Sequence, residues 1–175
     1  VHLFKQPPVD PVNDYEAVGT VLKQGWLLVV SANSPFKTLP ELTAYLKEKK
    51  DKASYSTATT NGAVMGEMYK SLLGLETVQV NYKTIGDSLN DLLSGNIDFA
   101  MADAAWALGQ IKNGRIRALG ISTPERMKSM PDIPTMKEGG VPGINLVFWM
   151  GVFVPKGTPQ PVKDKISEWL TQMLK

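Results

Sequence analysis

The sequence predicts an α/β fold with a largely parallel sheet. Short apolar runs of strand length alternate with amphipathic segments of about ten residues, and Gly, Pro, Ser and Asn punctuate most boundaries between them. The composition agrees, because 43% of the 175 residues are hydrophobic and 21% are charged. That balance is typical of a globular chain with a sizeable core.

Strands are predicted where apolar residues run together or alternate between turn signals. Residues 1–16 are Pro-rich and aperiodic, so we expect them to form a loop. Gly25 marks a turn or bulge between the first two strands. The expected strands are 17–21, 26–31, 54–57, 77–82, 97–101, 117–122 and 145–154, the last being one long strand or a pair.

Helices are predicted where apolar residues recur on one face between start and stop signals. The clearest start is Thr38, because Pro40 fits a first helical turn and Glu41 completes a capping box with Thr38. Gly74 closes a later helix as a typical C-terminal residue. The expected helices are 38–50, 63–73, 86–93, 104–113 and 161–174, with a short one near 135–139.

Composition and motifs exclude several functions. The chain has no cysteine and a single histidine, His2, so it offers neither a Cys-based site, a His-based triad nor a multi-His metal site. It has no phosphate-binding, dinucleotide-binding or nucleophile-elbow motif, so we predict no enzyme, no metal and no cofactor. The one dense charge run, Lys47–Lys52, fits a solvated helix end, and we expect no nucleic-acid partner. No apolar run approaches the roughly 20 residues that span a bilayer.

The most specific stretch is 113–161, NGRIRALGISTPERMKSMPDIPTMKEGGVPGINLVFWMGVFVPKGTPQP. Four further motifs precede it in order: Lys37–Leu42 (KTLPEL), Gly66–Lys70 (GEMYK), Val80–Lys83 (VNYK) and Asp91–Asp98 (DLLSGNID). Together these motifs resemble the TctC or Bug family, the periplasmic substrate-binding proteins of tripartite tricarboxylate transporters. The resemblance covers nearly the whole chain.

The resemblance implies a type II periplasmic-binding-protein-like fold, in which two α/β lobes close on a ligand. Members of the family are longer than this chain, so we expect one nearly complete lobe plus remnants of the other. A missing N-terminal part would then carry the export signal peptide. The expected division is a remnant of lobe one at 1–26, lobe two at 27–147 and a return to lobe one at 148–175. The hinge crossings would lie near Trp26 and Phe148.

In an open α/β sheet, ligands gather beyond the carboxyl ends of strands, where helix N-termini favour carboxylates. The first such junction supplies Thr57, Ala58, Thr59, Thr60 and Asn61. Their hydroxyl and backbone N–H groups could hold a carboxylate, or Thr60 or Asn61 could simply cap the next helix. The resemblance places a ligand loop here. Relatives have a Gly-x-Gly-Ser/Thr loop with a nearby His, whereas this chain has a shorter Thr-Thr-Asn-Gly segment.

Two further junctions follow. Tyr82 could hydrogen-bond a ligand and Lys83 could neutralise one, or they are a half-buried aromatic and a solvent-exposed lysine. Asp103 could receive a ligand ammonium or hydroxyl group, or it is the N-cap of the next helix. Trp106 next to it either narrows the cleft or packs in the core. Trp149, near the second expected hinge, is a ligand contact or a packing residue.

The resemblance implies an extracytoplasmic solute receptor in the periplasm. It would bind a small carboxylate (a di- or tricarboxylate, an amino acid or an aromatic acid) in an interlobe cleft and deliver it to the membrane permease subunits of the transporter. The alternative is the ligand-sensing domain of a LysR-type regulator, which has the same two-lobe fold. Apolar faces near Trp26, Phe148 and Trp169 also predict that a chain without most of lobe one self-associates.

Overall fold

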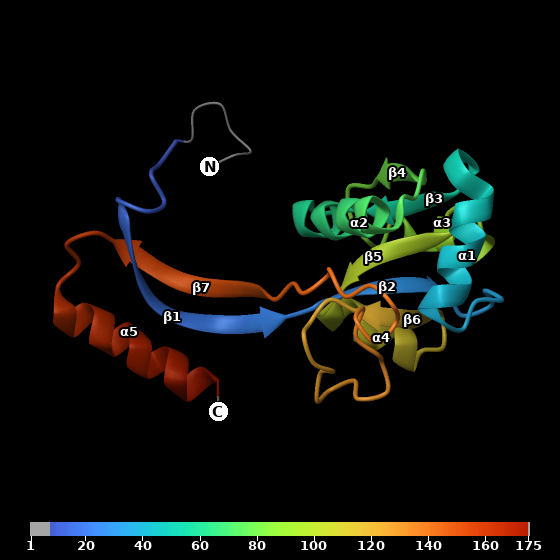
Figure 1. The fold of residues 1–175 in the computed structure, drawn as a ribbon. Coiled ribbons are helices and arrows are strands. Elements are labelled where there is room, and N and C mark those ends of the chain that lie inside the picture. Colours follow the sequence, from blue (N-terminus) through green and yellow to red (C-terminus); the bar gives the residue numbers. More distant parts are fainter. Residues whose placement is uncertain (1–7, 175) are drawn as a thin grey trace. The chain divides into compact units, whose positions relative to one another are not determined.

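The structure is a computed structural model that describes residues 8–174, so His2 lies outside the described residues (Figure 1). The chain divides into two compact units. The smaller unit contains the chain up to Lys23 and from Trp149 onward, and the larger unit is Gln24–Phe148. Each unit has a sheet of its own.

The sheet of the larger unit has five strands in the order β4-β3-β5-β2-β6. Because β2 is antiparallel to both of its neighbours, the other four strands run in one direction. The prediction of a largely parallel sheet is confirmed, with β2 as the exception. The strands are β2 (Trp26–Ser31), β3 (Ser54–Thr57), β4 (Val78–Asn81), β5 (Phe99–Asp103) and β6 (Ile116–Ile121).

Helices cover both faces of this sheet. On one face lie α1 (Leu39–Lys49), which runs into the 3-10 turn η1 (Lys50–Lys52), and α2 (Thr60–Leu73). On the other face lie α3 (Leu89–Ser94) and α4 (Ala104–Lys112). The predicted capping box at the start of α1 is confirmed, because Glu41 N donates to Thr38 Oγ1 at 3.4 Å and Thr38 N donates to Glu41 at 3.2 Å.

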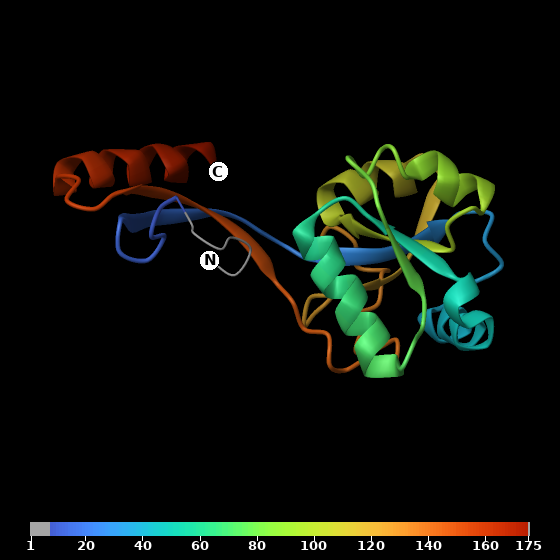
Figure 2. The same cartoon turned by 90° about the horizontal axis from the view of Figure 1, so that it is seen from above.

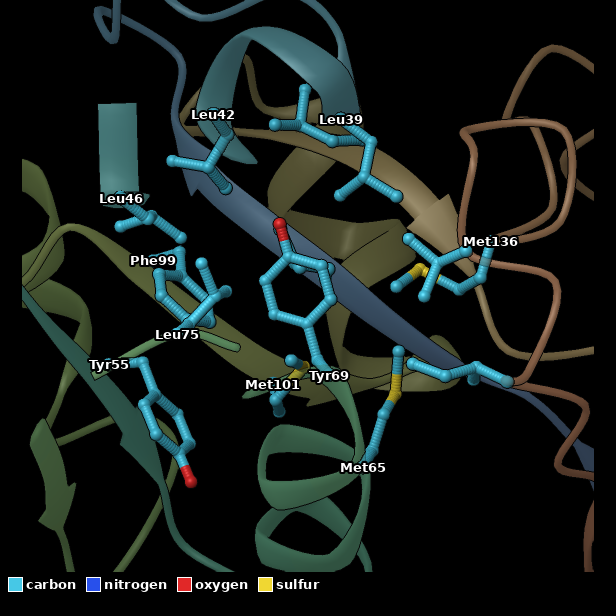
Figure 3. Packing of buried hydrophobic residues seen from close by; sticks show 14 of the residues in the cluster. Leu39, Leu42, Leu46, Tyr55, Met65, Tyr69, Leu75, Phe99, Met101 and Met136 are labelled. Carbon is cyan, nitrogen blue, oxygen red and sulfur yellow. The ribbon is translucent and has the colours of Figure 1, made fainter. Parts of the chain in front are cut away.

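Aromatic packing anchors the core between the sheet and the α1–α2 face. Tyr55 stacks on Phe99 with ring centroids 5.1 Å apart, and Tyr69 meets Phe99 edge-on at 5.9 Å. Figure 3 shows the Tyr69 hydroxyl pointing toward the leucines of α1, where it lies 2.6 Å from Thr43 Oγ1. The Tyr55 hydroxyl points away from this cluster (Figure 3).

The sheet of the smaller unit pairs β1 (Tyr15–Gln24) with β7 (Phe148–Pro155). These two strands run in opposite directions, and α5 (Gln160–Met173) lies along them (Figures 1 and 2). The Lys163 ammonium donates to Glu16 at 2.6 Å, and Leu170 contacts β1 beside Gly19. An ion pair and an apolar contact therefore join α5 to β1.

Several predicted boundaries are corrected. β1 begins at Tyr15, inside the expected loop, because pairing with β7 extends the strand beyond its apolar run. Of the two alternatives for 145–154, the single strand is confirmed, but it begins at Phe148. The expected helix at 135–139 is a hydrogen-bonded turn. Thr135 N donates to the Glu138 carboxylate at 2.7 Å, and Glu138 N donates to Thr135 Oγ1 at 3.1 Å. Gly140, with φ at 88°, ends the turn. Within residues 8–174, no helix is both long and apolar enough to cross a membrane.

Candidate functional site

The three predicted junctions meet at one edge of the larger sheet. We call it the carboxyl edge, because β3, β4 and β5 are parallel and all end there. Thr57 and Asp103 end β3 and β5, and Tyr82 directly follows β4. Tyr82 N donates to Thr57 O at 3.0 Å, which ties the first two junctions together. The N-termini of α2 and α4 start at the same edge.

At the β3–α2 junction, Thr59 caps the helix. Its Oγ1 accepts a hydrogen bond from Gly62 N at 3.1 Å, and its extended backbone, with φ at −141°, directs the hydroxyl to that first turn. The helix therefore begins at Thr60, earlier than predicted, and the interpretation of Thr60 or Asn61 as the cap is wrong. Both side chains are exposed. As at any helix start, the first backbone N–H groups point out of the helix.

The other residues of this loop differ in burial. Thr57 is only 2% exposed, and its hydroxyl donates to Thr59 O at 3.0 Å, so it stabilises the conformation of the loop from the buried side. Ala58 is half-buried, and Thr59 itself is exposed. The groups that remain accessible in this loop are therefore the hydroxyls and amide of Thr59, Thr60 and Asn61.

At the β5–α4 junction, Asp103 Oδ1 accepts a hydrogen bond from Trp106 N at 2.8 Å. The N-cap reading of Asp103 is thus confirmed. Trp106 is half-buried and packs against the apolar cluster on the α3–α4 face, as the core-packing alternative predicted. The cap brings a carboxylate to the carboxyl edge and leaves its second oxygen available.

At the β4–α3 junction, the structure corrects the predicted helix start. Residues 84–88 form a turn that Asp87 closes by accepting from Thr84 N at 3.0 Å, so α3 begins only at Leu89. The Tyr82 hydroxyl donates to Asp91 on α3 at 2.5 Å, and this bond raises the pKa of Tyr82. Its ring is half-buried, and Lys83 is exposed, as the simpler reading of this pair predicted.

Sequence reasoning missed two polar groups at the carboxyl edge. Trp26 lies opposite Asp103 in the β2–β5 register, and its backbone N–H donates to Ser122 Oγ at 2.9 Å. Trp26 is 4% exposed, packs edge-on against Phe148, and its indole nitrogen has no hydrogen-bond partner within residues 8–174. No sequence signal shows that β2 runs antiparallel, and only that direction brings Trp26, its first residue, to this edge.

The second missed residue is Asn81, which ends β4 opposite Thr57. Its side chain is exposed and lies 2.6 Å from that of Gln79. The alternation over 77–82 predicted the strand and placed Gln79 and Asn81 on a common face. The pattern does not show that this face is the one covered by α2.

Trp149 belongs to the smaller unit. It lies on β7 with its ring centroid 6.0 Å from that of Phe153. The side chain is 59% exposed, so it is not part of a core within the described residues, and its roles as a ligand contact or in packing at the hinge stay predictions.

A surface hollow of about 330 Å³ lies away from all the predicted residues, at the opposite edge of the larger sheet. Asp98 lines it and is saturated with donors: Tyr45 at 2.9 Å, Lys49 at 2.8 Å and the backbone N–H of Ser54 at 2.8 Å. Because these bonds also hold the start of β3, the hollow is part of the scaffold. In residues 8–174 no group of three or more His, Cys, Asp or Glu could hold a metal ion.

Solved structures with the same fold define the class of the protein. The structure entitled "Structure of a periplasmic transporter" is 31% identical with a TM-score of 0.86, covering 98% of this chain and 58% of that one. Rpa4515 of R. palustris with adipate is 25% identical with a TM-score of 0.83, covering 98% and 56%. MatC (Rpa3494) of Rhodopseudomonas palustris with bound malate is 26% identical with a TM-score of 0.81, covering 97% and 58%. The chain has the fold of periplasmic solute-binding receptors.

The sequence gives the family. The sequence profile described as "Tripartite tricarboxylate transporter family receptor" (TctC) matches residues 1–175, and the chain belongs to this family. An Agrobacterium vitis relative, "UPF0065 protein in the TAR-I ttuE-ttuC' intergenic region", is 33% identical over 176 residues, covering 99% of this chain and 51% of the relative. The family and the fold class inferred from the sequence motifs are confirmed. The chain spans about half the length of the curated relatives it matches.

Proposed function

We propose that this chain contributes the carboxyl edge of its larger unit to a periplasmic receptor for a small carboxylate. In this proposal residues 27–147 form lobe two, and 1–26 and 148–175 belong to lobe one. The observation that carries it is the convergence of two helix N-termini, those of α2 and α4, with the exposed Thr59–Asn61 segment at one edge. Family membership supports a solute ligand, and two structural neighbours carry the dicarboxylates adipate and malate.

The chemistry of the edge suits an anion without any buried cation. A helix N-terminus offers unpaired N–H groups and the positive end of the helix dipole, and both favour a carboxylate. The exposed hydroxyls of Thr59 and Thr60 add short-range donors, and exposed Lys83 adds a positive charge beside β4. We propose that lobe closure then removes the ligand from water and strengthens these bonds.

The proposal includes export and delivery. A signal peptide would bring the receptor to the periplasm, and the membrane permease subunits of a tripartite tricarboxylate transporter would take up its ligand. Cell fractionation tests the first point: recovery of the complete protein in the cytosol of its own host would contradict the receptor function.

Removal of the loop hydroxyls tests the ligand site. In the complete protein that carries this sequence, we expect malate, adipate or another small carboxylate to raise the melting temperature, as mass action requires. Thr60→Ala should lower the affinity for that ligand about 2- to 10-fold, which is the contribution of one neutral hydrogen bond. Thr59→Ala should do the same and also lower the stability by about 1 kcal/mol, because it removes the cap of α2.

Thr171→Ala on α5 is the matched control, because it removes a hydroxyl that bonds only the helix backbone, at 2.9 Å from Ser167 O. It should leave ligand affinity unchanged. Unchanged affinity in both the Thr59 and the Thr60 variants would remove this loop from the site. No response to any mono-, di- or tricarboxylate, amino acid or aromatic acid would contradict the carboxylate receptor itself.

A further inference from the structure

A chain of side-chain hydrogen bonds leads from α2 to the carboxyl edge. Tyr55 Oη lies 2.9 Å from Glu67 Oε1 and also 2.9 Å from the side-chain oxygen of Gln79. The Gln79 amide in turn lies 2.6 Å from the Asn81 amide. A phenol carries one proton, so Tyr55 cannot donate to both oxygens at once.

The charge on Glu67 decides where the Tyr55 proton goes. Lys70 lies 2.9 Å from Glu67 Oε1, and this bond lowers the pKa of Glu67, which is therefore ionised at neutral pH and can only accept. A hydrogen bond to a carboxylate is stronger than one to an amide, so Tyr55 donates to Glu67.

The direction of each following bond is then determined. The oxygen and nitrogen of a carboxamide exchange places by a half-turn, and the hydrogen-bond network decides between the two orientations. With its proton committed to Glu67, Tyr55 can only accept from Gln79, which must turn its NH₂ group toward the phenol. The Gln79 oxygen then faces Asn81, so Asn81 must donate through its own NH₂ group. The oxygen of Asn81, an exposed side chain, is then not used by Gln79.

Tyr55, from which this series of hydrogen bonds starts, is held in a fixed position. Tyr55 is fully buried, and its ring stacks on Phe99 with centroids 5.1 Å apart. Its other side faces α2 at Gly66, where even a Cβ atom would lie 2.3 Å from the ring. The phenol is therefore clamped, whereas Asn81 at the other end is exposed beside the first candidate junction.

We propose that the Glu67–Tyr55–Gln79–Asn81 chain, called the amide relay, holds Asn81 with its oxygen toward the carboxyl edge, where it accepts a hydrogen bond from a hydroxyl or ammonium group of the ligand. This inference rests on the proposed function and narrows its substrate class. A hydroxy- or amino-substituted dicarboxylate is preferred over the unsubstituted acid of equal length. Asn81 contacts the ligand, and Glu67, Tyr55 and Gln79 are positioning residues.

A matched ligand pair tests the relay in the complete protein. Malate and succinate differ by one hydroxyl group, so the ratio of their Kd values, measured by titration calorimetry, isolates that group. We expect the wild-type protein to prefer malate. Asn81→Ala, Tyr55→Phe and Glu67→Gln should each reduce the preference about 2- to 10-fold, the contribution of one neutral hydrogen bond. Succinate affinity should stay unchanged, which a merely structural loss would not allow.

Tyr45→Phe is the control, because it removes a phenol that donates to Asp98 at the opposite edge, and it should leave the ratio unchanged. Asn81→Ala alters an exposed side chain, so it gives the answer even where Tyr55→Phe disturbs folding. The relay would be overturned by a wild-type protein that binds succinate and malate equally, or by variants that keep the wild-type ratio of the two Kd values. Neither result would contradict the proposed receptor function. A protein that binds no carboxylate would overturn both.

Discussion

Glu138 shows how one side chain secures the Pro-rich segment after β6. The Arg126 guanidinium lies 3.0 Å from both carboxylate oxygens of Glu138, which also accepts from Thr135 N at 2.7 Å. The bond from Arg126 and then the backbone bond from Thr135 lower the pKa of Glu138 to about 2. One carboxylate therefore holds together the two ends of a segment that has no regular secondary structure.

This arrangement predicts a specific acid dependence. Because the folded-state pKa lies below the ordinary value of 4.5, the stabilisation is complete above pH 4.5 and is lost as the pH falls toward about 2. Glu138→Gln should lower the melting temperature at neutral pH and remove this part of the pH dependence. Thermal melts of both proteins between about pH 6 and about pH 2 measure the difference. Parallel curves over that range would contradict the role of Glu138.

Local side-chain chemistry was predictable from sequence only where the partners are close in the chain. The Thr38–Glu41 box was predicted correctly, since both residues lie in one helical turn. Asp103 was correctly considered as a cap for the same reason. The capping role of Thr59 was missed because the choice among three consecutive polar residues depends on where the backbone leaves β3. The amide relay was missed because Tyr55 and Gln79 meet only through the pairing of β3 with β4.

Two helical glycines provide a paired test of packing. In α2, a Cβ atom at Gly66 would lie 2.3 Å from the buried Tyr55 ring, which is itself stacked on Phe99 and cannot withdraw. In α4, a Cβ atom at Gly109 would meet nothing within 4 Å. The same substitution should therefore have opposite effects in the two helices.

Gly66→Ala should destabilise the protein by about 1–3 kcal/mol, the usual result of overpacking a core. Gly109→Ala should stabilise it by about 0.5–1 kcal/mol, because alanine loses less backbone entropy in a helix. Urea unfolding of both variants measures the two free energies. Equal effects in the two proteins would show that α2 does not approach β3 as closely as described.

Periodicity predicted which elements exist, but long-range pairing decided their limits. The five main helices and all the strands of the larger sheet were expected near their observed places. The segments at 86–88 and 135–139 form turns, which side-chain bonds between Thr84 and Asp87 and between Thr135 and Glu138 close. The antiparallel direction of β2 was not predictable, since a short apolar run reads the same in either direction. That direction brings Trp26 to the candidate site, so this part of the site was also missed.

The smaller unit exposes large apolar side chains on its strands and on its helix. Trp149 is 59% exposed on β7, and Trp169 and Met173 are 54% and 80% exposed on α5. Several large exposed apolar side chains in one small unit favour association in water. The prediction that Trp26 and Phe148 contribute to such a face is wrong, because Trp26 is 4% exposed and Phe148 packs against it, whereas Trp169 is exposed as expected. We therefore expect the 175-residue chain to self-associate through its smaller unit.

Trp169→Gln together with Met173→Gln should shift the chain toward the monomer, as measured by light scattering over a range of concentrations. Val64→Gln, which changes a 46% exposed residue on α2 of the larger unit, is the control and should leave the assembly unchanged. A wild-type chain that stays a monodisperse monomer at every concentration would contradict this expectation.

The ends of the larger unit lie side by side, because the rings of Trp26 and Phe148 pack edge-on with centroids 5.8 Å apart. A domain with adjoining ends can be inserted into or removed from a longer polypeptide without separating the flanking segments. Gln24–Phe148 therefore has the geometry of a cassette. Recombination between related genes could exchange it in one step, and the ligand preference that we propose for its carboxyl edge would move with it into a new host sequence.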